Sequence, residues 1–418
     1  MTYTGATVVI PTRNRATIAM NSIRSVLNQP VENLSVMVSD NSTTPADSEA
    51  LAVFCSRLAD NRLRYLRPPE SLSMTRHWEW AIQEALRFYE ASHFSYLTDR
   101  MMFRKGGLKE VLDLSALYPE KIISYNMDRI VDHVSPIRIE ECPGTGRLLE
   151  VESQQFTRLF SQAIFHPGLP RMLNTIVPRE ILTRMVARFG NVFSSIAPDF
   201  SFCCRCLDME DIILFYDKSP LFHYALHRSN GASVSRGEMT PDNADFTANL
   251  PVDNSIRNYA TPIPSLNTAV NAGFNEYFIF QRETGNPRFF EVDRQQYLAA
   301  NAREVREIAE PELRREMLSM LVAKGYREVV TNCQPVAAEI PFLNRVRFKL
   351  KRLFTGPATT PAWLFLARTF NIRPPGDNIF EFATLDDALD YASKISVGNI
   401  NRTLAPERLL MARDVPTL

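Results

Sequence analysis

Short apolar runs alternate with amphipathic stretches through the N-terminal part of the chain. Ala6–Ile10 and Leu34–Val38 are largely apolar and rich in β-branched residues, which is typical of strands buried on both faces. The stretch between them places Ala19, Ile23 and Val26 on one helical face. Strand, helix and strand in this order predict a parallel pair of strands joined by a right-handed crossover.

The same alternation continues along the chain. Leu63–Leu66 predicts a third strand, and a helical pattern over Thr75–Ala91 leads into a strand that ends at Asp99. Polar turns follow the strands at Thr12, Asp40 and Asp99. Because ligands of an open α/β sheet bind at the carboxyl ends of its strands, we expect these three turns to meet in one crevice.

Composition excludes several classes of function. Lys plus Arg and Asp plus Glu both number 47, so the formal net charge is zero and no global field would steer the chain to nucleic acid. The six cysteines are scattered, and the chain starts directly into a strand without a basic-then-apolar leader. No apolar run approaches the roughly 20 residues that span a bilayer. We therefore expect a cytoplasmic protein, at most peripheral on the inner membrane face.

Three motifs in fixed order carry a family resemblance. They are Val8–Arg15, Val38–Ser42 and Glu70–Trp78. Together they resemble the opening strand and turn, the nucleotide-base loop and the loop before the next helix of the family 2 glycosyltransferases. The resemblance covers about residues 5 to 235. It implies an α/β protein of the GT-A type, with a Rossmann-like, mostly parallel sheet flanked by helices and a mainly helical C-terminal region.

The resemblance also implies a division of the chain into functional parts. A polar segment rich in Pro and Asn over 237–265 separates the α/β part from helical patterns at 293–307, 310–324 and 385–395. At 418 residues the chain is too long for one compact domain. The expected parts are a catalytic domain over 1–236 with a donor half at about 1–105 and an acceptor half at about 106–236, a linker or lid over 237–265, and a mainly helical region over 266–418.

The implied donor is a nucleotide-diphosphate sugar, with a UDP-sugar favoured. Thr12 and Asp40 would hold the nucleotide, and Asp40 would accept a hydrogen bond from the base. Asp40 equally fits an Asx turn at a strand end. Arg13 stands where the family often carries an aromatic residue, and it either contacts phosphate or is solvated. The donor-binding candidates are Pro11, Thr12, Arg13, Arg15, Asp40, Asn41, Arg76, Thr98, Asp99 and Arg228.

The metal motif of the resemblance is reduced to one carboxylate, Asp99. Related enzymes carry two or more acids at this strand end, which hold a divalent metal on the diphosphate. Here the neighbours are Thr98 and Arg100. We expect an Mg²⁺ or Mn²⁺ ion assisted by Asp99, with His227 or His223 as a further ligand. A lone histidine is equally a structural residue.

In a second interpretation, arginine side chains supply the positive charge that a metal would otherwise supply. Arg100, with Arg76 or Arg15, would neutralise the departing diphosphate, because a guanidinium pairs bidentately with phosphate and stays charged. Arg100 could also form a plain ion pair with Asp99. The sequence leaves these alternatives open, and the metal-assisted one is favoured.

Asp199 is the candidate catalytic base. It precedes a helical stretch, as one acid of the family's acidic pair does, with Pro198 where another acid is often found. A carboxylate in a water-poor cleft gains basicity by desolvation. The alternative is that Asp199 caps a helix that starts at Phe200. The nearby cysteines Cys203, Cys204 and Cys206 do not have the spacing of a zinc site, so buried side chains are expected.

The stretch 340–354 predicts a basic amphipathic helix. Leu343, Val346, Leu350 and Leu353 share one helical face, and arginines and lysines surround it. Such a helix either docks on the protein with a solvated face, which is favoured, or makes peripheral contact with an anionic membrane.

The predicted function is an inverting glycosyltransferase. It would move a sugar to a hydroxyl of a glycan or lipid-linked acceptor in bacterial surface glycan synthesis, with Asp199 as base and Arg100 supporting the leaving group. One rival is a nucleotidyltransferase on a similar sheet, which would need a basic, Gly-rich first loop that is absent from the sequence. The other is a non-catalytic nucleotide-sugar-binding module.

Overall fold

The structure is a computed structural model. It describes residues 3–142, 144–225, 228–237, 240–248, 259–326, 379–395 and 407–408. The predicted basic helix at 340–354 and the candidate metal ligand His227 lie outside these ranges. No helix among the described residues is both long and apolar enough to cross a membrane.

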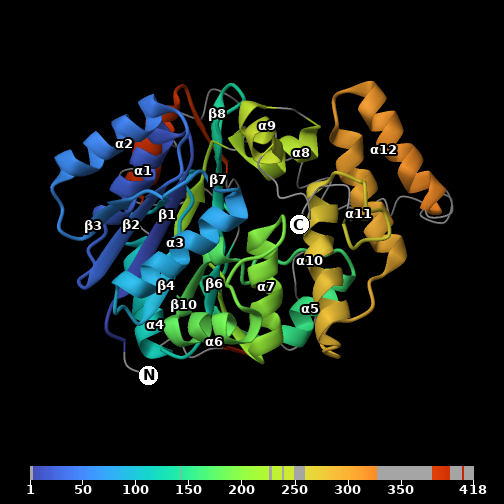
Figure 1. The fold of residues 1–418 in the computed structure, drawn as a ribbon, viewed down its shortest axis with the longest axis horizontal. Coiled ribbons are helices and arrows are strands. Elements are labelled where there is room, and N and C mark those ends of the chain that lie inside the picture. Colours follow the sequence, from blue (N-terminus) through green and yellow to red (C-terminus); the bar gives the residue numbers. More distant parts are fainter. Residues whose placement is uncertain are drawn as a thin grey trace, which may run out of the picture.

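A nine-stranded mixed sheet forms the centre of the molecule (Figure 1). Its parallel pairs are β1 with β2, β1 with β4, β2 with β3, β6 with β11 and β9 with β14. The full order is β14-β9-β11-β6-β10-β4-β1-β2-β3. The bounds are β1 Ala6–Thr12, β2 Leu34–Asp40, β3 Leu63–Leu66, β4 His93–Tyr96, β6 Ile123–Tyr125, β9 Leu148–Glu152, β10 Thr175–Pro178, β11 Ile212–Tyr216 and β14 Glu407–Arg408.

Successive residues of the central strands serve opposite faces of the sheet, as the strand period of two requires. Val8 and Ile10 pack into one core with α1, α2 and α4, whereas Val9 and Met37 pack into a second core with α3, α6 and α7. Helices therefore cover both faces. Their bounds are α1 Ala16–Leu27, α2 Pro45–Leu58, α3 Met74–Phe88, α4 Gly107–Leu117, α5 Ser153–Ser161, α6 Arg179–Phe189 and α7 Pro198–Met209.

A smaller sheet joins segments that are far apart in the sequence. Its order is β13-β8-β7-β12-β5. The strand that directly follows Asp99 and Arg100 is β5, and it pairs antiparallel with β12 so that Met101 lies opposite His223. The pairing brings His223 beside Arg100. The bounds are β5 Met101–Phe103, β7 Asp128–Val131, β8 Ile137–Glu140, β12 Leu221–His223 and β13 Ile379–Phe382.

The C-terminal helices share a core with the α/β part. The ring of Tyr277 stacks on Phe160 of α5 at a centroid distance of 4.9 Å, and Phe274 meets Phe160 edge-on at 5.3 Å. Figure 1 shows α10 beside α5 and α7, with α11 next to α10 and α12 farther from the sheet. The bounds are η1 Met172–Asn174, α8 Asn230–Arg236, α9 Pro241–Ala248, α10 Ala269–Thr284, α11 Arg294–Glu307, α12 Pro311–Ala323 and α16 Leu385–Lys394.

The predicted fold class is confirmed, and several boundaries differ. The strand predicted to end at Asp99 ends at Tyr96, because the chain turns there and Met101 N donates to Thr98 O. The helix predicted to start at Phe200 starts at Pro198, so Asp199 lies in its first turn and Ala197 is the N-cap. The predicted linker over 237–265 contains α9. Cys203, Cys204 and Cys206 are buried, as expected.

Candidate functional site

A cavity of about 400 Å³ opens where the central strands end. Its walls come from the turns after β1 and β4, from the start of α7, and from α8, α9 and α10. The polar turns of the parallel strands thus meet in one crevice, as their places at the carboxyl ends require. The predicted site residues that line it are Pro11, Thr12, Arg13, Arg15, Asn41, Thr98, Asp99, Arg100 and Asp199.

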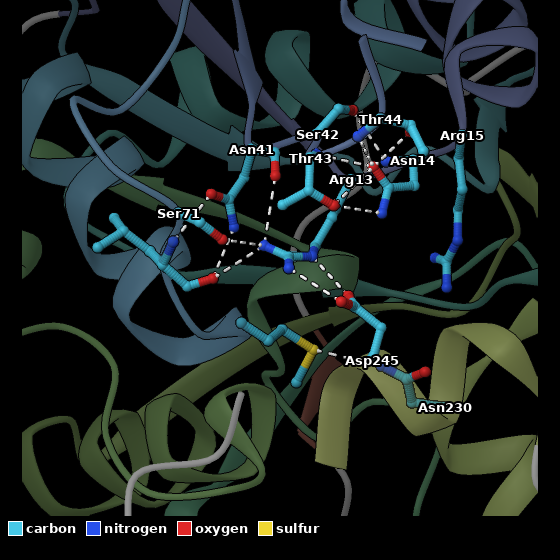
Figure 2. Close-up of polar contacts among 12 residues, drawn as sticks. Arg13, Asn14, Arg15, Asn41, Ser42, Thr43, Thr44, Ser71, Asn230 and Asp245 are labelled. Atoms are coloured by element: carbon cyan, nitrogen blue, oxygen red, sulfur yellow. Dashed lines mark hydrogen bonds and ion pairs between the residues drawn. The ribbon is translucent and has the colours of Figure 1, made fainter. Parts of the chain in front are cut away.

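The turn after β1 is tied to the loop after β2 (Figure 2). Asn14, at a left-handed φ of 53°, accepts hydrogen bonds from the Thr43 and Thr44 amides at 2.8 and 3.1 Å. The backbone amide of Asn14 donates to the Ser42 hydroxyl at 2.8 Å. Asn tolerates this backbone conformation better than most residues. The motif residue Asn14 therefore fixes the shape of the loop that carries Arg13 and Arg15.

Arg13 forms an ion pair with Asp245 of α9. Its Nε donates to Asp245 Oδ2 at 2.6 Å, and its second guanidinium nitrogen donates to Oδ1 at 3.0 Å. Figure 2 shows this fork, together with a further bond from Arg13 to the Ser71 hydroxyl at 2.9 Å. A phosphate contact by Arg13 would have to displace Asp245.

Asp99 lies between two arginines and a hydroxyl. Thr12 Oγ1 donates to its Oδ2 at 2.9 Å. Its Oδ1 lies 3.5 Å from a terminal guanidinium nitrogen of Arg15 and 4.0 Å from Arg100 Nε. The Ser22 hydroxyl holds the backbone carbonyl of Asp99 at 2.8 Å. The carboxylate is nearly buried, and both arginines line the cavity together with it.

Arg100 also reaches His223. Its terminal nitrogen lies 2.9 Å from His223 Nε2. A guanidinium only donates, so Nε2 must accept and the imidazole is neutral. Burial, and then the cations Arg100, Arg171 and Arg129, hold the pKa of His223 well below its usual value. The histidine thus buttresses Arg100 without adding charge.

The described residues around Asp99 do not fit a divalent metal. Among them, no group of three or more His, Cys, Asp or Glu side chains is placed to hold an ion. The nearest charged groups to Asp99 are the Arg15 and Arg100 cations, which would oppose Mg²⁺ or Mn²⁺. The lone pair of His223 Nε2 is taken by Arg100. The expected metal on Asp99 stays a prediction, and its further candidate ligand His227 lies outside the described residues.

Asp199 faces the same cavity from the first turn of α7. Burial raises the pKa of this carboxyl, while the neighbouring Arg171 and hydrogen bonds from the amides of Phe200 and Asp199 oppose the rise. A carboxylate with a raised pKa holds a proton better, which suits a general base. Asp199 and the arginines therefore share one cavity.

Arg171 was not predicted from the sequence. It lines the cavity from the loop before η1, and its guanidinium carbon lies 5.9 Å from the Phe200 ring centroid. No local pattern marks this arginine, because only the packing of the loop against α7 brings it to the site. Arg15, Arg100 and Arg171 together give the cavity a cationic wall.

Other predicted residues lie apart from the cavity. Asp40 is fully buried and forms the Asx turn considered above, with Oδ1 accepting the Ser42 amide at 2.8 Å and Oδ2 accepting the Tyr65 hydroxyl at 2.7 Å. Arg76 is exposed on α3. The carbonyl of Arg228 accepts a bond from Arg15 at 2.8 Å, which ties the segment before α8 to the site.

The sheet order and the crevice at the strand ends define a Rossmann-like α/β protein. Within that class, residues 7–88 match the family described as Glycosyl transferase family 2, which confirms the resemblance carried by the three motifs. A search of curated proteins gave no match.

Solved structures with a similar chain path come from Staphylococcus aureus. TarS 1–349 in complex with UDP-GlcNAc is 16% identical at a TM-score of 0.43, with 78% of this chain and 90% of that chain covered. TarS 1–349 alone is 14% identical at a TM-score of 0.42, with the same coverage. A longer TarS structure is 12% identical at 0.42 and is covered over 54% of its length, against 78% of this chain. Likenesses this weak say nothing of substrate.

Proposed function

We propose that this protein is an inverting glycosyltransferase that uses a nucleotide-diphosphate sugar, with UDP as the favoured nucleotide. One observation carries the proposal. A single cavity joins Arg15, Arg100 and Arg171 to a carboxylate of raised pKa, and its first wall belongs to the segment that matches the glycosyl transferase family. The arrangement offers a site for a diphosphate leaving group and, across the same space, a base for a hydroxyl acceptor.

The leaving group is the diphosphate. When the bond from the anomeric carbon to the phosphate oxygen breaks, its electron pair stays on the nucleoside diphosphate. Arg15, Arg100 and Arg171 would offset that charge through hydrogen bonds that strengthen as it develops. Asp99 holds two of these side chains in place beforehand, so little reorganisation is needed during the reaction.

The acceptor hydroxyl attacks from the Asp199 side. Its oxygen forms the new bond to the anomeric carbon in line with the departing diphosphate, and its proton passes to the Asp199 carboxylate. One displacement of this kind inverts the anomeric centre. Burial raises the pKa of Asp199, so kcat should fall on the acid side through a pKa above the usual Asp value of about 3.9.

Asp199→Asn is the direct test of the base. The amide keeps the shape of the side chain and cannot take the proton, so transfer should fall at least about 100-fold while nucleotide affinity stays within about twofold. We would screen UDP-, GDP-, ADP- and dTDP-linked sugars for hydrolysis and transfer, and measure nucleotide binding by calorimetry. Near-normal turnover in Asp199→Asn would remove the base assignment. A wild-type protein that binds none of these nucleotides would remove the proposed function itself.

A further inference from the structure

A second carboxyl group lies behind the predicted base and comes from the C-terminal helices. Glu276 of α10 is 1% exposed. Its carboxyl lies near the Ser195 hydroxyl and the Ala197 amide, which both act to lower its pKa. Asn275 Nδ2 bridges the two sides, at 3.0 Å from Glu276 Oε1 and 3.1 Å from Ser195 Oγ. Glu276 does not line the cavity, so it acts on the wall from behind.

The turn that Glu276 holds leads directly into α7. Ser195 has a φ of 61°, a left-handed conformation that costs energy in a residue other than glycine. Its carbonyl accepts a bond from Thr75 of α3 at 2.6 Å. Ala197 is the N-cap of α7, and Asp199 follows two residues later. Contacts from α3 and α10 therefore fix the backbone from which Asp199 reaches the cavity.

The approach of α10 to α7 is close enough to make these contacts direct. A Cβ at Gly273 would lie 3.4 Å from the Phe200 ring, so the glycine permits this spacing. The charged or titratable neighbours of Glu276 are Asp199, Cys204 and Arg205 on α7, and Tyr259 before α10. The site wall and the C-terminal helices thus form one packed unit at this point.

Glu276 carries little charge at neutral pH. Burial above all raises its pKa to about 8, and the charge of Asp199 adds to the rise, against the hydrogen bonds from Ser195, Asn275 and Ala197. A largely protonated carboxyl accepts the same hydrogen bonds without placing a second full negative charge behind Asp199. Such a group can hold the turn and leave the electrostatics of the cleft to Asp199 and the arginines.

We propose that Glu276 is a positioning residue for Asp199, through which the C-terminal helical region takes part in transfer; this inference rests on the proposed function. The carboxyl accepts from Asn275, whose amide also holds Ser195, and the turn at Ser195 leads into the first turn of α7. The C-terminal region is then part of the catalytic apparatus.

The test compares Glu276→Ala with Glu276→Gln. Glu276→Ala should lower kcat at least tenfold and leave the donor KM within about twofold, because the acceptor-side base moves and the arginines do not. Glu276→Gln should recover kcat to within about threefold of wild type, because its amide oxygen accepts the same bonds and matches the protonated carboxyl. Glu283→Gln, an exposed residue of the same helix, is the matched control.

Two further measurements keep the outcome decisive. Ser195→Gly keeps the left-handed backbone and removes the hydroxyl that accepts from Asn275 beside Glu276, so it should lower kcat in the same direction if Glu276→Ala fails to fold. Amide hydrogen exchange over residues 190–200 should rise in Glu276→Ala and Ser195→Gly only. Wild-type kcat with unchanged exchange in both variants would overturn the inference. A wild-type protein without any transfer activity would instead overturn the proposed function. Amide hydrogen exchange would still test whether Glu276 positions the turn before α7.

Discussion

At the scale of single residues, Asp99 is a partner of arginines. Its carboxylate receives Thr12 Oγ1 at 2.9 Å and faces Arg15 and Arg100. A carboxylate so placed fixes the direction of two guanidinium forks, and the planar fork matches the oxygens of a phosphate. His223 adds a further restraint on Arg100. In this arrangement Asp99 lies against two positive charges that line the cavity.

Arg100→Ala should therefore damage transfer. The loss of one preorganised donor to the leaving group should cost about 2 kcal/mol in transition-state stabilisation, which is roughly 30-fold in kcat/KM. Arg100→Lys should recover only part of this, because a point charge does not reproduce the fork. Steady-state kinetics would be measured beside Arg87→Ala, an exposed arginine of α3. Full activity in Arg100→Ala would show that the diphosphate is stabilised elsewhere.

At the scale of elements, the loop after β2 is held by the neighbouring strand β3. Asp40 accepts the Tyr65 hydroxyl across the strand pair and the Ser42 amide within its own loop. Asn41 then faces Leu72, donating to its carbonyl at 2.7 Å and accepting from its amide at 3.0 Å. These bonds form a scaffold under the cavity, and Asp40 is part of the scaffold.

Asp40→Ala should chiefly destabilise the fold. It leaves the buried Ser42 amide unsatisfied, which costs about 1–3 kcal/mol, and removes the shorter of the two hydrogen bonds that the half-buried Tyr65 hydroxyl donates. Chemical denaturation would give the loss, and Tyr65→Phe should reproduce a smaller part of it. Calorimetry with UDP separates this from the predicted base contact. An Asp40→Ala variant with normal stability and weak UDP binding would show that Asp40 contacts the nucleotide.

The strands and their turns were predictable from the sequence, and the partners of the site residues were not. Hydrophobic period and polar turns were enough to place β1, β2, β3 and the crevice, because these are local signals. Arg171 and Glu276 carry no local signal, since each reaches the site through packing between distant segments. The hydrogen bond that Tyr65 donates to Asp40 was unpredictable for the same reason, because it depends on the register of β2 and β3.

At the scale of the whole molecule, the cavity closes between the α/β part and the later helices. Asp245 of α9 binds Arg13, Ala269 and Ala272 of α10 line the wall, and Glu276 supports it from behind. The boundary between a catalytic domain and a separate helical region stays a prediction. Transfer should require both parts, because both supply walls of one cavity.

The central claim is that arginines neutralise the diphosphate in this cavity. The sequence alone favoured an Mg²⁺ or Mn²⁺ ion on Asp99, and the described surroundings of Asp99 are cationic. The most direct test is transfer by metal-stripped wild-type protein in excess EDTA, measured against the same protein with added Mg²⁺ or Mn²⁺. We predict rates that agree within about twofold, because no divalent charge has to be supplied. Activity that EDTA abolishes and Mn²⁺ restores would contradict the account and show that a metal ion neutralises the leaving group.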